Sequence, residues 1–67
     1  MIELSVNGEL KRVPAPIDIA GLLVELTLTG KKVAVERNGE IVPRSSYANT
    51  RLAQGDKLEI VVAVGGG

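Results

Sequence analysis

The sequence predicts an α+β fold, in which a mixed sheet of four to five strands has one helix packed across it. Three observations predict this fold: apolar residues alternate with polar ones in several short segments, one segment has the helical period, and two Asn-Gly pairs mark tight turns. A chain of 67 residues has room for one hydrophobic core, because so short a chain buries only about 60% of its unfolded surface. We expect one domain over residues 1–64 and a flexible glycine tail over residues 65–67.

The N-terminal segment is expected to form a hairpin. Apolar and polar residues alternate from residue 2 to residue 6, and an Asn-Gly pair follows. A second strand over about residues 10–13 then returns antiparallel. Two registers stay open: a strict two-residue turn places Lys11 opposite Leu4, whereas a bulge turns Leu10 inward.

The helical segment follows two prolines. Asp18 is placed to cap its N-terminus, and Gly30 suits its exit. Gly21 within it costs about 1 kcal/mol relative to Ala. Either it allows the helix to approach the sheet closely, or it is a weakness without a role. Four apolar residues recur with the helical spacing i, i+3, i+4 and i+7, namely Ile19, Leu22, Leu23 and Leu26. We expect this stripe to cover the sheet face formed by Leu4, Val33, Val35, Leu58, Ile60 and Val62.

The C-terminal half is expected to supply the remaining strands. Residues 33–35 alternate, a second Asn-Gly pair follows, and a short return strand ends at Pro43. A helical turn over residues 45–47 is also expected. The last strand, 57–64, is apolar on both faces, which is typical of a strand in the middle of a sheet or of one that a partner covers. A hairpin, one helix and a last strand inserted beside the first describe the ubiquitin-like β-grasp, one of a few α+β topologies that this order allows.

The composition excludes several kinds of active site. The chain has no His and no Cys, so imidazole bases, thiolate nucleophiles and most zinc ligands are absent. It has no phosphate-binding loop, and we therefore expect no catalytic residue, no metal and no bound cofactor. Eight basic and eight acidic residues are scattered along the chain and Tyr47 is the single aromatic residue, which argues against nucleic acid as a partner. What remains is a binding module, or a protein that is itself a substrate.

The sequence also bears on location. Neither a membrane-spanning segment nor a signal peptide is evident, because the apolar runs are short and the N-terminus lacks a basic region. We therefore expect no membrane association and a cytoplasmic address.

The chain ends in Val64 followed by three glycines. In one reading these glycines are a frayed end. In the other they are an arm without side chains, which threads a narrow channel and places its carboxylate in the active site of another protein; any Cβ would obstruct that path. A carboxylate resists nucleophiles, so an enzyme would first convert it with ATP to an acyl adenylate. A sulfur nucleophile would then displace AMP and leave a thiocarboxylate.

Three segments resemble the ThiS family, the sulfur carriers of thiazole biosynthesis: residues 36–44, the Gly55-Asp56 turn and the ending 63–67. The resemblance runs the length of the chain. It implies that a ubiquitin-activating-type adenylating enzyme uses ATP to adenylate Gly67, which then becomes a thiocarboxylate, with Gly65 and Gly66 inserted in the partner's active site. It further implies thiazole synthase as the sulfur acceptor and a separate enzyme that delivers the sulfur.

Other residues and other destinations stay open. Val61 and Ala63 are candidates for the surface that docks on the adenylating enzyme, although ordinary strand interior also explains them. Arg37 and Arg44 can meet acidic partner surfaces or can be solvated surface charge. The same carrier chemistry also serves molybdopterin synthesis or tRNA thiolation. An interaction module with an inert tail belongs to a different class.

Overall fold

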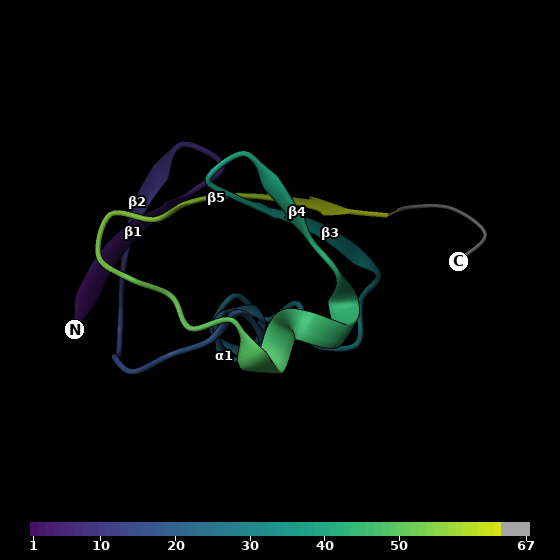
Figure 1. The fold of residues 1–67 in the computed structure, drawn as a ribbon, viewed down its shortest axis with the longest axis horizontal. Helices are drawn as coiled ribbons and strands as arrows, with labels where there is room; N and C mark the ends of the chain where they lie inside the picture. Colours follow the sequence, from purple (N-terminus) through teal and green to yellow (C-terminus); the bar gives the residue numbers. More distant parts are fainter. Residues whose placement is uncertain (64–67) are drawn as a thin grey trace.

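The computed structural model describes residues 1–63, and residues 64–67 lie outside the described part. The elements in chain order are β1 (Ile2–Val6), β2 (Glu9–Val13), α1 (Ile19–Glu25), β3 (Val33–Arg37), β4 (Glu40–Val42), a 3₁₀-helix η1 (Arg44–Asn49) and β5 (Lys57–Val62). Figure 1 shows the strands as one layer, with α1 and η1 together on one side of it. The helical turn expected near residue 45 is η1, and the predicted tail over residues 65–67 lies outside the described residues.

The strands form one five-stranded sheet in the order β2-β1-β5-β3-β4. β5 runs parallel to β1 and antiparallel to β3, so the sheet is mixed. The last strand therefore lies in the middle of the sheet beside the first, as predicted from its two apolar faces.

The first hairpin has the strict two-residue turn. Leu4 lies opposite Lys11, and both turn residues have positive φ, 52° for Asn7 and 84° for Gly8. This pair of angles is that of a type I′ turn, whose twist matches that of the strands it joins. Leu10 is 73% exposed, so the alternative of a bulge is wrong: the regular ladder turns that side chain away from the core.

The N-terminus of α1 is capped as predicted. The side chain of Asp18 accepts a hydrogen bond of 2.7 Å from the backbone N–H of Gly21. A Cβ added to Gly21 would lie 3.0 Å from Cγ1 of Ile17, in the segment that enters the helix. The close approach at Gly21 is therefore to Ile17, and the expected approach to the sheet is not what the glycine accommodates.

The C-terminus of α1 lies earlier than Gly30. The N–H of Thr27 donates to the carbonyl of Val24 at 3.0 Å, and that of Leu28 donates to Leu23 at 2.8 Å. These two bonds form a Schellman motif, in which the residue with left-handed conformation is Thr27, with φ of 61°. The prediction that Gly30 ends the helix is wrong, because the helix ends three residues earlier, where Thr27 occupies the left-handed position that glycine usually takes.

Replacing Thr27 with Gly is expected to raise the free energy of unfolding by about 0.5 to 1 kcal/mol. Glycine removes the steric cost of the left-handed conformation, and its greater freedom in the unfolded chain offsets only part of that gain. Urea denaturation measures the difference. Thr29→Gly is the matched control, since Thr29 is exposed in the same loop without positive φ and glycine there should only destabilise. A gain of the same size from both substitutions would contradict this explanation.

The core lies between α1 and the sheet face that α1 covers. The predicted helix stripe is confirmed, because Ile19, Leu22 and Leu23 are buried and Leu26 packs partly buried against them. On the sheet, the buried predicted residues are Leu4, Val35, Leu58 and Ile60, with Val33 partly buried. Val6 is buried as well, as the period of two in the first strand indicates, whereas sequence periodicity missed three other buried core residues, namely Val13, Tyr47 and Leu52.

The prediction that Val62 belongs to the core is wrong. Val62 is 37% exposed although it shares the inward side of β5 with Leu58 and Ile60. The seven residues of α1 span roughly 10 Å at the rise of a helix. The six residues of β5 span roughly 20 Å. The helix is therefore too short to cover the whole strand, and its end leaves Val62 accessible.

The support of the C-terminal strand and the sheet face around it

The predicted site residues Gly65, Gly66 and Gly67 lie outside the described residues, so the structure bears on the site through the strand that precedes them. β5 ends at Val62, which pairs with Val33 of β3. Beyond the strand, the N–H of Ala63 still donates to the carbonyl of Lys32 at 2.8 Å. Backbone pairing therefore continues to the last described residue.

The middle of β5 is held by the side chain of Asn7. The ladder between β1 and β5 stops at Val6 and Leu58, which would leave the backbone groups of Ile60 on that side without a strand partner. Oδ1 of Asn7 accepts from the N–H of Ile60 at 2.8 Å, and Nδ2 donates to its carbonyl at 3.0 Å. The side-chain amide of Asn7 thus takes the place of one further residue of β1, and it satisfies the N–H and the carbonyl of Ile60, since backbone polar groups away from water need hydrogen-bond partners.

The start of β5 is held by the second Asn-Gly turn. Oδ1 of Asn38 accepts from the N–H of Lys57 at 2.9 Å, and the backbone N–H of Asn38 donates to the carbonyl of Lys57 at 2.7 Å. The φ angles of 52° and 86° at Asn38 and Gly39 match those of the first hairpin. Both predicted turns therefore bind the central strand through their asparagines, a role that the turn signal itself does not indicate.

Asp56 precedes β5 and is the buried charged residue of the described chain, with 7% of its surface exposed. Its carboxylate accepts three hydrogen bonds, from Nε of Arg37 at 2.9 Å, from the N–H of Ala53 at 2.9 Å and from Nδ2 of Asn38 at 3.1 Å. Burial by itself would raise the pKa of Asp56. The hydrogen bonds from Ala53, Asn38 and Arg37 and the charge of Arg37 outweigh it, so the pKa lies below its ordinary value of 3.8. Arg37, which the sequence offered as a partner contact, is an internal ion-pair partner instead.

The sheet face away from α1 carries exposed apolar side chains. Val61 is 65% exposed and lies opposite Ala34, and Ala63 is also exposed. Ile41 is 68% exposed and lies opposite Glu36, which lies opposite Glu59 in turn. We call these residues the outer-face patch: Ala34, Glu36, Ile41, Glu59, Val61 and Ala63.

The structure thus brings the two predicted docking residues, Val61 and Ala63, together with two apolar residues that sequence reasoning missed. Ala34 was detectable, because it alternates with the inward valines of its strand. Ile41 was detectable once the Asn-Gly turn set its register against Glu36. The exposure of Val61 shows that it does not serve the core.

Two further findings concern residues 1–63. No three side chains of Asp, Glu, His or Cys in that range are grouped so that they can hold a metal ion. No helix in the same range is long and apolar enough to span a membrane.

Known proteins resemble the chain over nearly its full length. The thiazole synthase of Paramagnetospirillum magneticum is 52% identical over 66 residues, which are 98% of this chain but only 20% of that relative. The chain therefore corresponds to about a fifth of that longer protein. The sulfur carrier protein ThiS of Bacillus subtilis is 45% identical over 49 residues, covering 73% of this chain and 74% of the relative.

Solved structures agree with the sequence comparisons. The crystal structure of a thiamine biosynthesis protein (ThiS) from Geobacter metallireducens matches with a TM-score of 0.82 at 32% identity, over 98% of this chain and 100% of that one. The common fold, a mixed five-stranded sheet with one helix across it, confirms the predicted ubiquitin-like β-grasp. The sequence pattern of the ThiS family matches residues 4–67, and the chain belongs to that family.

Proposed function

We propose that this protein is a sulfur carrier of thiamin biosynthesis, whose C-terminal residue Gly67 is adenylated and then converted to a thiocarboxylate. Membership of the ThiS family is the observation that carries the proposal. The fold supports it, because β5 is held at its start, middle and end and its backbone pairing continues to Ala63. A firmly held strand that leads into glycines 65–67 of the sequence suits delivery of a terminal group to another protein.

The chemistry assigns one role to this chain and the remaining roles to its partners. A carboxylate oxygen of Gly67 attacks the α-phosphorus of ATP, and pyrophosphate leaves. A sulfur nucleophile such as hydrosulfide then attacks the acyl carbon, AMP leaves, and the terminus becomes a thiocarboxylate. The adenylating enzyme binds the ATP and catalyses the first step, so the chain acts as a co-substrate without a catalytic site. Gly65 and Gly66 occupy the channel of the partner, where a Cβ would collide.

Three partners follow from this role. A ubiquitin-activating-type enzyme adenylates the carrier, a sulfur-delivering enzyme supplies the nucleophile, and thiazole synthase consumes the product. The similarity to part of a thiazole synthase supports the last of these, because linkage in one chain raises the effective concentration of one domain at another. The outer-face patch is the proposed docking surface for the adenylating enzyme, since its exposed valine and isoleucine contribute nothing to the core. A cytoplasmic location, where ATP is available to the adenylating enzyme, is part of the proposal.

Mass spectrometry tests the proposal directly. The protein is incubated with ATP, magnesium, the adenylating enzyme of the same organism and sulfide, and the intact mass is measured. We expect a gain equal to the exchange of one oxygen for one sulfur, which fragmentation localises to Gly67. Omission of the adenylating enzyme is the control and should leave the mass unchanged. If the mass stays unchanged in the full mixture while the Bacillus subtilis carrier is converted by its own enzyme, the tail is inert and the interaction-module reading is correct.

A further inference from the structure

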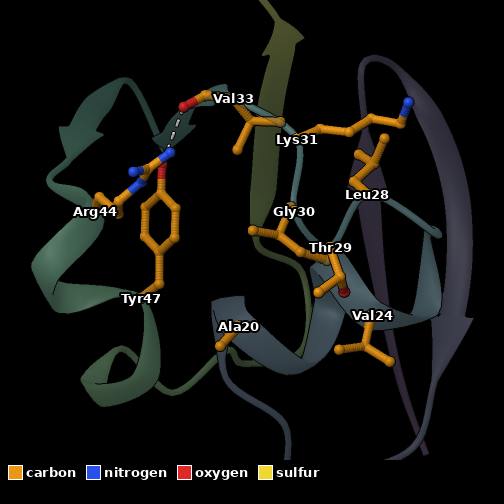
Figure 2. A pocket seen from close by; sticks show the side chains of 10 residues that line it. Ala20, Val24, Leu28, Thr29, Gly30, Lys31, Val33, Arg44 and Tyr47 are labelled. Carbon is orange, nitrogen blue, oxygen red and sulfur yellow. Dashed lines mark hydrogen bonds between the residues drawn. The ribbon is translucent and has the colours of Figure 1, made fainter.

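A groove of about 440 Å³ opens on the helix side of the sheet, between α1, the loop after it and η1. Figure 2 shows its lining residues, which come from all three segments. The walls are mainly apolar and include Val24, Leu28 and Val33, with the ring of Tyr47 beside them. Lys31 and Arg44 complete the lining, so an apolar depression has two cations at its margin.

The groove combines an exposed apolar side chain, an anchored tyrosine and two cations. Val24 is 61% exposed, although it lies on the one helix that forms the core. Tyr47 is 9% exposed and is anchored, because its hydroxyl donates to the carbonyl of Val33 at 3.4 Å. Within residues 1–63, neither Lys31 nor Arg44 has a carboxylate within ion-pairing distance, since the ion pairs found there are Lys11–Glu9 and Arg37–Asp56.

The groove also lies where the chain leaves the sheet. Val33, one of its walls, pairs with Val62, and the preceding carbonyl of Lys32 accepts from Ala63. Four residues follow Ala63 in the sequence, and four extended residues span at most about 14 Å. A protein that takes Gly67 into its active site must therefore bring its surface close to this groove.

The two sides of this exit differ in charge. The outer face of the sheet carries Glu36 and Glu59 directly opposite each other with Lys57 beside them, whereas the groove side carries Lys31 and Arg44. A partner that surrounds the tail thus meets mixed charges on one side of the sheet and two basic groups on the other. Complementary charges at the rim of an interface fix the orientation of docking and speed association.

We propose that the groove docks a segment of thiazole synthase in which an apolar side chain stands beside an Asp or Glu carboxylate. The apolar side chain covers Val24 and Leu28, and the carboxylate pairs with Arg44, whose guanidinium can bind both its oxygens. The identity of the partner rests on the proposed function, whereas the acidic and apolar character of the segment follows from the groove. Similarity of this chain to part of a thiazole synthase selects that enzyme over the adenylating enzyme.

The test compares charge reversals by calorimetry with thiazole synthase from the same organism. We expect the double variant Lys31→Glu and Arg44→Glu to bind about tenfold more weakly, with a smaller dependence on salt, because two attractions become repulsions. Arg12→Glu is the matched control: it makes the same kind of charge change at an exposed site on β2, at the far edge of the sheet from the groove. All three substituted residues are exposed, so we expect both variants to fold as the wild type does. Thermal melts check this expectation.

A second measurement locates the contact. A photoreactive residue at Val24 should crosslink to thiazole synthase at a segment that contains Asp or Glu, whereas one at Leu10, exposed on β2, should not. The inference is overturned if the wild-type protein does not bind or if Val24 crosslinks only to a basic segment. It is also overturned if the loss of affinity per reversed charge is no larger in the double variant than in Arg12→Glu. Thiocarboxylation of Gly67 is assayed in parallel with the same variants. If the wild-type protein is not thiocarboxylated, the proposed function is refuted. If it is thiocarboxylated but the double variant binds thiazole synthase as the wild type does, the groove proposal alone is refuted.

Discussion

Deletion of Gly67 is expected to abolish thiocarboxylate formation and to leave the thermal melting temperature nearly unchanged. An adenylating enzyme must hold the terminal carboxylate within bonding distance of the α-phosphorus of ATP, and a displacement of about 1 Å can cost about a hundredfold in rate. The deletion shortens an extended chain by about 3.3 Å. Residues 1–63 contain the whole described core, so removal of the last residue takes away no packing seen there.

Two companion variants sharpen this experiment. Gly66→Val should also block the reaction, because a β-branched side chain restricts the backbone and obstructs a narrow channel. An alanine added after Gly67 replaces the reacting terminus and should prevent modification of Gly67. Arg12→Ala, an exposed substitution on β2 at the far edge of the sheet, is the control and should react as the wild type does. Normal thiocarboxylate yield from the Gly67 deletion, measured by mass spectrometry, would show that the terminus is not the site.

Replacing Asp56 with Ala is expected to lower the free energy of unfolding at neutral pH by about 3 kcal/mol. The substitution leaves a backbone N–H and the Arg37 and Asn38 side chains without their acceptor, and breaking a buried charge pair is strongly destabilising. Glu59→Ala, which removes an exposed carboxylate from the following strand, is the control and should cost less than about 0.5 kcal/mol. Urea denaturation measures both. Equal costs for the two variants would contradict the role assigned to Asp56.

The same carboxylate makes stability depend on pH. The pKa of Asp56 is lower in the folded protein than in the unfolded chain, so the unfolded state binds its proton first as the pH falls. Its contribution to stability is therefore fully present above the ordinary Asp pKa of 3.8 and is lost as the pH falls through the lower, folded value. The difference in free energy of unfolding between the wild type and Asp56→Ala should therefore become smaller in that acidic range. A gap that stays constant from neutral to strongly acidic pH would show that the ionised carboxylate is not what stabilises the fold.

Local patterns in the sequence were sufficient for most of the elements. The period of two over residues 2–6, the helical stripe that begins at Ile19 and the alternation that begins at residue 57 each identified an element, because alternation and helical spacing determine which residues can share a face. The Asn-Gly pairs located both hairpins, since type I′ turns require two residues that tolerate positive φ. The glycine tail and the segment 36–44 indicated the ThiS family, to which the chain belongs.

Tertiary structure decided the features that depend on contacts between distant segments. Thr27 ends the helix in a conformation that favours glycine, because Leu23 and Leu28 on either side of it are held by a backbone hydrogen bond and by burial against the core. Val62 stays accessible because the length of α1 limits what it covers. The asparagine amides bind β5, Asp56 is neutralised by Arg37, and Arg44 stands unpaired in the described part of the chain, beside an apolar groove. Each of these depends on which strands become neighbours, and residues up to 53 positions apart are joined only when the last strand enters beside the first. Sequence periodicity specifies the faces of single elements, whereas the partners across those faces exist only in the assembled sheet.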